Sequence, residues 1–266
     1  MELLKYIFYG IIQGLTEFIP VSSTAHLKII SLFFGIDDPG SSVSATIQIG
    51  SVFAIFWYFR KSIFNFKNTN SRKPRYSFLF NKLNKSIFIG TIPIVFIGGI
   101  IKLFVPGFSD SFLRSNLSIA LVSILMSLIM LFADISTKKS INLNNHKYPN
   151  SLYIGIAQAF AIVPGVSRSG ATISMALLSG WNRKDAAKFS FLLGIPSISL
   201  AAFVEFFSTV NQYSAFPFLP LFAGLITAFF SSLLAINFLI KYVSSNGLKI
   251  FVYYRLIFGI LILLNL

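Results

Sequence analysis

Long apolar runs recur along this chain, and they constrain its fold more than any other feature. The runs are continuous in Phe, Ile, Leu and Ala, and at about 20 residues each they can cross roughly 30 Å of hydrocarbon as helices. The chain of 266 residues is 55% hydrophobic and 11% charged, with a mean hydropathy of +0.76. A transmembrane barrel would require alternating polar and apolar positions instead. The sequence therefore predicts an all-α polytopic membrane protein with a single integral membrane domain over residues 1–266.

The net charge of +14 is distributed as a topology signal. The strongest basic cluster follows the apolar run 43–59, contains no acid, and consists of Arg60, Lys61, Lys67, Arg72, Lys73, Arg75, Lys82 and Lys85. By the positive-inside rule, the loop 60–86 is cytoplasmic. Spans are then predicted at 87–105, 117–135, 189–208, 217–240 and 250–265, with further inner segments marked by Lys138, Lys139, Lys147, Arg183, Lys184, Lys188, Lys241 and Lys249. Because the basic residues lie in loops rather than on one amphipathic face, we expect no nucleic-acid partner.

Two regions do not fit simple spans. Residues 151–181 lie between two basic segments but have PGVSRSG at their midpoint, so we predict a hairpin that enters from the cytoplasmic side and returns to it. Residues 1–36 are broken by PVSST and precede an outside-to-inside span, so their hairpin enters from the outside. We read the N-terminus as mature, since the first apolar run continues directly into QGLTEFIP. The two re-entrant helical hairpins therefore have opposite orientation.

The two hairpins also resemble each other in sequence. GIIQGLTEFIPVSST from Gly10 and GIAQAFAIVPGVSRSG from Gly155 share a glycine, a glutamine three residues later, a proline and a serine. Farther along each half, GTIPIVFIGG at 90–99 resembles LGIPSISLAA at 193–202. We interpret the halves, approximately 1–135 and 151–266, as an inverted-topology repeat, a design whose sites form where broken helices meet. A chance match of short apolar segments is the alternative.

The stretch QGLTEFIPVSSTAH carries ionisable side chains where hydrocarbon is expected. Glu17 is one of eight acids in the chain, and an intramembrane acid is costly enough to indicate a function or a water-filled cavity. His26 can act as a general acid or base near neutral pH. The alternatives are a carboxylate at the membrane interface and a histidine hydrogen-bonded in the core. The proximity of Ser22, Ser23 and Thr24 favours a functional site.

Arg168 carries the clearest chemical signal in the second hairpin. It is flanked by Ser167 and Ser169 and followed by Gly170 and Thr172. An arginine placed by a Pro-Gly loop at a helix N-terminus offers bidentate N–H donors and backbone N–H groups to an oxyanion. An arginine that snorkels to the membrane surface is the alternative. The surrounding SRSGAT favours a phosphate site.

We expect the two polar loops to face each other, and their side chains together predict phosphoryl transfer. Arg168 and N–H donors would hold a phosphate, a hydroxyl or water would attack it, and Glu17 with His26 would move protons or hold Mg²⁺ or Ca²⁺. With Glu17 as the one evident carboxylate, such a divalent cation would be held largely by the substrate's own phosphates. The substrate would be an amphiphile with an anionic head that enters laterally from the membrane lipids. The absence of cysteine excludes thiolate catalysis and cysteine-held metals.

Together, QGLTEFIPVSSTAH and PGVSRSGAT resemble the undecaprenyl pyrophosphate phosphatases of the bacitracin-resistance type, and the resemblance covers essentially the whole chain. It implies a hydrolase of the bacterial inner membrane that converts undecaprenyl diphosphate to undecaprenyl phosphate and phosphate. Such an enzyme recycles the lipid carrier for peptidoglycan synthesis and confers bacitracin resistance. The resemblance also implies a polyprenyl diphosphate lipid as partner and a site that opens toward the outer face. Assembly into a homo-oligomer is left open.

The resemblance also implies roles for individual residues. The family's first motif, (E/Q)xxxE, falls on Gln13 and Glu17 in its glutamine form, and because Gln13 cannot take a proton, a metal mechanism with two carboxylates is in question. The family's serine nucleophile falls on Ser23, with His26 as its proton-transfer partner. The substrate-binding residues implied are Gln13, Ser22, Thr24, Ser167, Arg168, Ser169 and Thr172.

The resemblance leaves the chemical route and one rival function open. Ser23 attacks the terminal phosphorus after His26 or Glu17 takes its proton, or Glu17 activates a water molecule directly. Inverted repeats with broken helices are also typical of transporters, so a transporter or flippase of a lipid phosphate is the alternative function. A helix bundle without a site is a weaker alternative.

Overall fold

The computed structural model is mostly helical over its described residues, which are 2–36, 40–63, 82–105, 107–108, 111–136, 140–212 and 218–266. The first half contains α1 (Glu2–Phe18), α2 (Ser23–Phe34), α3 (Gly40–Ile63), α5 (Lys82–Phe104), the 3-10 turn η2 (Phe112–Arg114) and α6 (Asn116–Ile135). The second half contains α7 (Tyr148–Ala159), η3 (Phe160–Ile162), α8 (Arg168–Leu178), α9 (Arg183–Gln212), α10 (Phe218–Asn246) and α11 (Lys249–Leu264). The predicted all-α fold is confirmed.

Within the described residues, four helices are long and apolar enough to cross a membrane, namely α5, α6, α9 and α10. Their ends correct the predicted boundaries. α9 begins at Arg183 and α10 continues to Asn246, so Lys188 and Lys241 lie in helices rather than in loops. The 29 residues of α10 rise about 43 Å at roughly 1.5 Å per residue, which exceeds the hydrocarbon thickness. A lysine near the end of so long a helix can reach the headgroup region.

Most of the predicted cytoplasmic loop 60–86 lies outside the described residues, as do Lys138 and Lys139. Its two ends are described. Arg60 lies in the last turns of α3 with its guanidinium 4.4 Å from the ring centre of Trp57, and Lys82 begins α5. A cation stacked on tryptophan at the end of an apolar helix is typical of a membrane–water interface.

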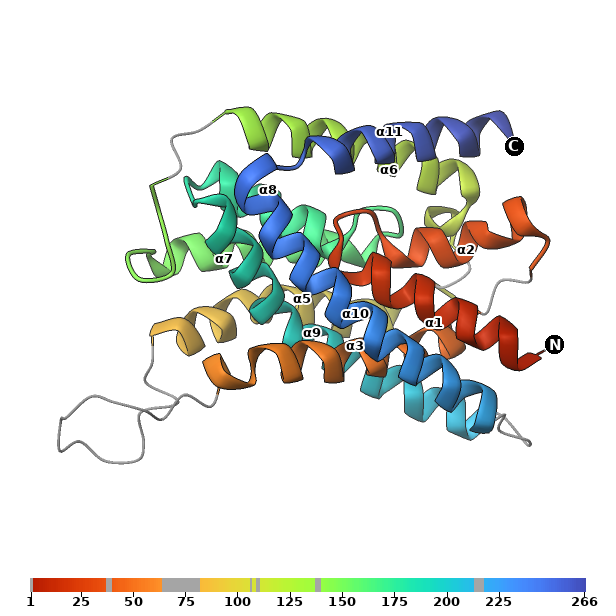
Figure 1. Ribbon diagram of the computed structural model, residues 1–266. Helices are drawn as coiled ribbons and strands as arrows, with labels where there is room; N and C mark the ends of the chain where they lie inside the picture. The colour runs from red at the N-terminus through yellow and green to blue at the C-terminus, as the bar shows by residue number, and fades with distance from the viewer. Residues whose placement is uncertain are drawn as a thin grey trace, which may run out of the picture.

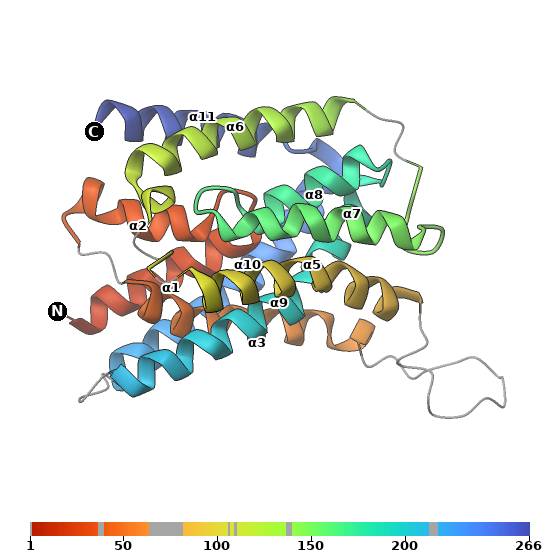
Figure 2. The same ribbon diagram turned by 180° about the vertical axis from the view of Figure 1, so that it is seen from behind.

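Both predicted hairpins are present, and they enter from opposite ends of the molecule (Figure 1). α1 and α2 come from the end that carries both termini, whereas α7 and α8 come from the other end. Figure 2 shows the same arrangement from behind, with the bends of the two hairpins close together in the middle. α1 ends two residues before Pro20, and η3 ends two residues before Pro164, because proline cannot donate the N–H that would continue a helix.

The helices of the two halves pair in corresponding ways. α1 packs along α10 and α7 packs along α5, while α6 packs against α11 and α3 against α9. Each hairpin crosses its partner at a pair of glycines: Gly10 lies against Gly224, and Gly155 lies against Gly90. This packing follows the pattern that an inverted repeat predicts.

The largest buried apolar cluster lies directly beside the two hairpin bends. Its aromatic members include Phe18 at the end of α1 and Phe191 in α9, whose rings meet edge to face at 5.4 Å. Glu17 and Ser190 are their neighbours in sequence. The apolar contact therefore holds the last turn of α1 against the middle of α9, next to the polar residues described below.

Candidate functional site

The two hairpin bends share an unusual backbone. Ser22 (φ +77°) and Ser167 (φ +69°) are the only non-glycine residues with positive φ in the described part of the chain. Each hydroxyl caps the helix that follows, since Ser22 Oγ accepts from the Ala25 N–H at 3.4 Å and Ser167 Oγ accepts from the Gly170 N–H at 3.2 Å. Backbone strain of this kind clusters at functional sites. Both bends are therefore candidate halves of one site.

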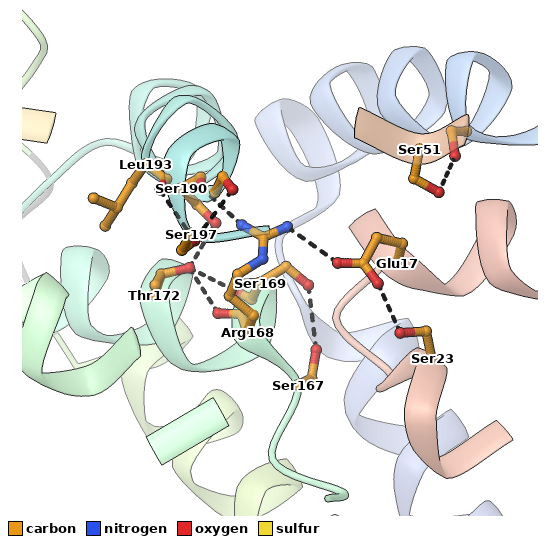
Figure 3. A network of polar contacts seen from close by, with 12 residues as sticks. Glu17, Ser23, Ser51, Ser167, Arg168, Ser169, Thr172, Ser190, Leu193 and Ser197 are labelled. Carbon is orange, nitrogen blue, oxygen red and sulfur yellow. Dashed lines mark hydrogen bonds and ion pairs between the residues drawn. The ribbon is translucent and has the colours of Figure 1, made fainter. Parts of the chain in front are cut away.

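Glu17 lies at the centre of the site and accepts hydrogen bonds from its own hairpin (Figure 3). The Ser23 hydroxyl donates to Glu17 Oε2 at 2.7 Å, and Gln13 Nε2 donates to the same oxygen at 2.9 Å. All three side chains are buried. A carboxylate at this distance can accept the serine proton, and the amide of Gln13 fixes the orientation of that carboxylate.

Arg168 faces Glu17 from the second hairpin (Figure 3). Its Nη2 lies 3.8 Å from Glu17 Oε1, and its Nη1 donates to the Ser190 carbonyl at 3.0 Å. Nε and Nη2 are buried without a hydrogen-bond partner. Buried donors without acceptors are costly, and a guanidinium with two such donors suits the oxygens of a phosphate. The hairpins thus bring the predicted residues Glu17, Ser23 and Arg168 together.

Small and hydroxyl side chains hold Arg168 in place. Thr172 Oγ1 donates to the Arg168 carbonyl at 2.8 Å and lies 2.6 Å from Ser190 Oγ. On the other side, the guanidinium lies so close to Gly194 that a side-chain carbon there would overlap it. The Ser169 hydroxyl donates across the two bends to the Ile19 carbonyl at 3.3 Å and lies 3.2 Å from that of Ser167.

His26 is bonded elsewhere. Its Nδ1 lies 2.7 Å from the Ser22 carbonyl, and its Nε2 lies 2.7 Å from the hydroxyl of Tyr254. Nδ1 therefore carries the proton and Nε2 accepts one from tyrosine, while the ring stacks on Phe258 at 4.4 Å. The expected transfer of the Ser23 proton to His26 is not supported by this geometry, because Glu17 occupies that position. Thr24 is exposed beside the site.

A cavity of about 210 Å³ reaches the site from the surface. Its walls include Gln13, Ser23 and Thr24 from the first hairpin, together with the basic Lys28 and Arg114 and the acidic Glu205. The wider opening beyond Lys28 and Arg114 lies at η2. The cavity that leads to Ser23 is thus lined by two basic residues and one acidic residue.

The comparisons with known proteins give one matching family and relatives that share one name. The model of the family described as "Bacitracin resistance protein BacA" matches residues 6–261. The chain belongs to the BacA family. A relative from Prochlorococcus marinus subsp. pastoris (strain CCMP1986 / NIES-2087 / MED4), named undecaprenyl-diphosphatase, is 94% identical over the full length of both chains. Relatives of the same name from Prochlorococcus marinus (strain MIT 9515) and Synechococcus sp. (strain CC9311) are 80% and 45% identical, covering 100% and 96% of this chain and 100% and 91% of their own.

The residues present at the BacA-type site fit a divalent cation held largely by substrate. No group of three His, Asp or Glu side chains suited to a metal ion occurs among the described residues. Glu17 offers a carboxylate, a hard oxygen ligand, while Gln13 turns its amide nitrogen toward that carboxylate. Mg²⁺ commonly binds through one carboxylate together with substrate phosphates and water. Glu17 stays the proposed protein ligand.

Three residues of the site were missed at the level of sequence. Ser190 and Gly194 surround the guanidinium of Arg168, and Arg255 binds the backbone of both bends. Both Ser190 and Gly194 lie in the stretch FSFLLGIP at 189–196. Ser190 and Gly194 are four residues apart and so lie on one helix face. This spacing was the sequence signal that could have indicated a polar contact on that face.

Proposed function

We propose that this chain is a membrane phosphatase that hydrolyses undecaprenyl diphosphate to undecaprenyl phosphate and inorganic phosphate. The observation that carries the proposal is the constellation of Ser23, Glu17 and Arg168, in which a hydroxyl, a carboxylate and a cation with unused donors meet. Relatives that match the whole chain bear the name of this activity. The reaction recycles the lipid carrier of cell-wall synthesis, and the family description links it to bacitracin resistance.

In the proposed reaction, Glu17 takes the proton of the Ser23 hydroxyl as Oγ attacks the terminal phosphorus. The bond from that phosphorus to the bridging oxygen breaks, and Glu17 gives the proton to the departing undecaprenyl phosphate, which leaves the carboxylate free again. Water then cleaves the phosphoserine, while Glu17 accepts a proton from the water and returns it to Ser23. Arg168 and the backbone N–H groups at the start of α8 stabilise the charge on the phosphate oxygens in both steps.

A divalent cation, Mg²⁺ or Ca²⁺, is proposed as a largely substrate-held cofactor. When bound, it neutralises charge on the diphosphate. Glu17 is the protein group that would contact it, and Gln13, Ser22, Thr24, Ser167, Ser169 and Thr172 complete the proposed binding site. Phosphate release should fall on addition of EDTA and recover with excess Mg²⁺, and isothermal titration of Mg²⁺ should show binding that requires the lipid diphosphate.

We further propose that the protein lies in the bacterial inner membrane with its site open to the outer face. The basic residues Arg60 and Lys82 mark one end of the bundle, which the positive-inside rule makes cytoplasmic. The cavity past Ser23 opens instead at η2. A substrate head would therefore enter from the outer leaflet while its isoprenoid tail stays among the lipids.

The decisive experiment measures phosphate release from a C55 diphosphate by purified protein in detergent. We expect turnover by the wild type, and a loss of at least about 100-fold in Ser23→Ala and Arg168→Ala. Ser127→Ala is the matched control, because that buried hydroxyl donates only to the Ile124 carbonyl of its own helix. Near-normal turnover by Ser23→Ala would make the covalent route wrong and leave direct attack by water activated by Glu17.

A flippase of a lipid phosphate is the second candidate, and the opposed broken hairpins favour it. The same assay separates the two functions. A pure flippase releases no phosphate at any protein concentration, but moves a labelled lipid phosphate between leaflets of a vesicle.

A further inference from the structure

Arg255 is a fully buried arginine in the middle of α11. Among the described residues it has no carboxylate within ion-pair distance. Its guanidinium donates instead to three backbone carbonyls: Nε to Ser123 at 3.4 Å, Nη1 to Pro20 at 3.3 Å, and Nη2 to Gly165 at short range. Pro20 and Gly165 lie in the bends of the first and second hairpins. One side chain therefore binds both halves of the site and the neighbouring helix α6.

The bends need such donors because a broken helix leaves its carbonyls unbonded. Where water is excluded, each unsatisfied carbonyl costs free energy, so irregular backbone persists in a membrane protein only when side chains or neighbouring helices satisfy it. In the first bend the carbonyls of Ile19 and Ser22 also accept backbone N–H groups, whereas the Pro20 carbonyl receives its hydrogen bond from Arg255. Arginine suits this task because its planar fork carries five N–H donors.

The rest of α11 reinforces the same contact. Tyr254 bonds to His26, which in turn holds the Ser22 carbonyl. Gly259 brings α11 so close to α6 that a side-chain carbon would press on Ile124 and on the Ala120 carbonyl. The helix that carries Arg255 is thus itself fixed in position.

We propose that Arg255 is a positioning residue that locks the two hairpin bends together, so that Ser23 and Arg168 engage the same diphosphate. The inference rests on the proposed function for its catalytic consequence, although the distance between the bends can be measured without it. Arg255 touches neither Ser23 nor Arg168 through a hydrogen bond; its effect passes through the Pro20 and Gly165 carbonyls.

The test uses Arg255→Met, which removes all the donors, and Arg255→Lys, which keeps the charge and some donors but loses the planar fork. The chain has no native cysteine, so spin labels can be attached at Thr24→Cys and Phe160→Cys, two exposed positions at the two bends. We expect a narrow distance distribution in the unsubstituted background, a broad one in Arg255→Met, and an intermediate one in Arg255→Lys.

Kinetics of the same Arg255 variants without labels complete the test. Because misplacement by about 1 Å can cost on the order of 100-fold in rate, we expect kcat of Arg255→Met to fall about 100-fold, with KM changed less, and Arg255→Lys to recover part of the loss. Arg183→Met is the control: it removes a basic residue paired with Asp134 away from the bends, so it should lower stability but leave kcat and the distance distribution unchanged.

Three outcomes for Arg255→Met would overturn the proposal. The distance distribution could stay unchanged, or kcat could fall without any change in that distribution. The distribution could also broaden only as much as it does in Arg183→Met. If Arg255→Met does not fold, Arg255→Lys decides alone, and wild-type distances with wild-type kcat in that variant refute the positioning role. A wild type that releases no phosphate would refute the proposed function, while the distances would still decide whether Arg255 joins the bends.

Discussion

Arg168 depends on the absence of a side chain at Gly194. The guanidinium occupies the space that a β-carbon at Gly194 would fill, so Gly194→Ala must displace Arg168 or shift α9. Alanine favours a helix over glycine by about 1 kcal/mol. Helix propensity should therefore not make Gly194→Ala less stable than the wild type. We expect phosphate release by Gly194→Ala to fall at least about 10-fold, mainly through a higher KM, because the displaced cation binds the diphosphate less well.

Gly99→Ala is the matched control for that experiment, since nothing lies within 4 Å of a β-carbon at Gly99. It should keep wild-type kinetics. Equal kinetics for Gly194→Ala and the wild type would contradict the close approach of Arg168 to α9.

His26 offers a second prediction at this scale. If its role is to hold the Ser22 carbonyl, His26→Asn should keep much of the activity, because the asparagine amide can place an N–H where Nδ1 now lies. His26→Ala should lose at least about 10-fold in kcat. The measurement is kcat for both variants. Equal and severe loss in both would restore His26 as the proton-transfer partner of Ser23.

The helices α1 and α7 approach their partners closely, and this contact sets where each bend lies. Gly10 lies against Gly224 and Gly155 against Gly90, so an added methyl group at either position must separate two backbones. We expect Gly10→Ala and Gly155→Ala each to destabilise the protein by about 1–3 kcal/mol, seen as a lower melting temperature in detergent.

Gly98→Ala serves as the control for the crossing glycines, because the nearest atom to its β-carbon is Ile162 Cδ1 at 3.9 Å. Unchanged melting temperatures for Gly10→Ala and Gly155→Ala would contradict the close crossings. A large effect in one hairpin alone would contradict their equivalence.

Much of this arrangement follows from the sequence, because the signals are local. Pro20 and the Pro-Gly pair after η3 predict the breaks, and basic loops predict which end each hairpin enters. Glu17 and Arg168 stand out because an ionisable side chain in an apolar segment needs a partner. The positive φ of Ser22 and Ser167 had no such signal, since serine rarely adopts that backbone.

Arg255 could not be assigned from sequence for a different reason. Its run, VYYRLIFG, has no other charged residue, and its partners are backbone carbonyls of residues 90, 132 and 235 positions away. Every residue has a carbonyl, so nothing in the chain marks the three that Arg255 binds. These three carbonyls can be identified only from the structure, in which the two bends lie next to each other. The same holds for His26, whose ring nitrogens bind one carbonyl and one distant tyrosine.

At the scale of the whole molecule, His146 ties the segment before α7 to the bundle. It is buried, its Nδ1 lies 2.8 Å from the Leu143 carbonyl, and its Nε2 lies 2.7 Å from Ser86 Oγ. Burial lowers the pKa of His146 below its ordinary value. In the unfolded chain, His146 therefore becomes protonated as the pH falls through about 6.5. In the folded chain, it becomes protonated only at a lower pH. Stability is full above that pH and falls as pH drops toward the lower folded pKa.

The expected outcome is a melting temperature in detergent that falls between about pH 7.5 and 5.5. His146→Gln should be less stable at pH 7.5 but should show a shallower fall, because glutamine does not titrate. A slope as steep as that of the wild type would contradict the contribution of His146.

The orientation of the whole bundle decides whether the site can serve the outer leaflet, and the cysteine-free chain makes it testable. Phe112 is 69% exposed in η2 beside the wider opening of the cavity, and Ser140 is exposed near the start of the 140–147 segment. A membrane-impermeant maleimide should label Phe112→Cys in intact cells and Ser140→Cys only after permeabilisation. Equal labelling of both after permeabilisation is the control for reactivity. The reverse pattern would place Ser23 open to the cytoplasm, and the basic ends of α3 and α5 would then violate the positive-inside rule.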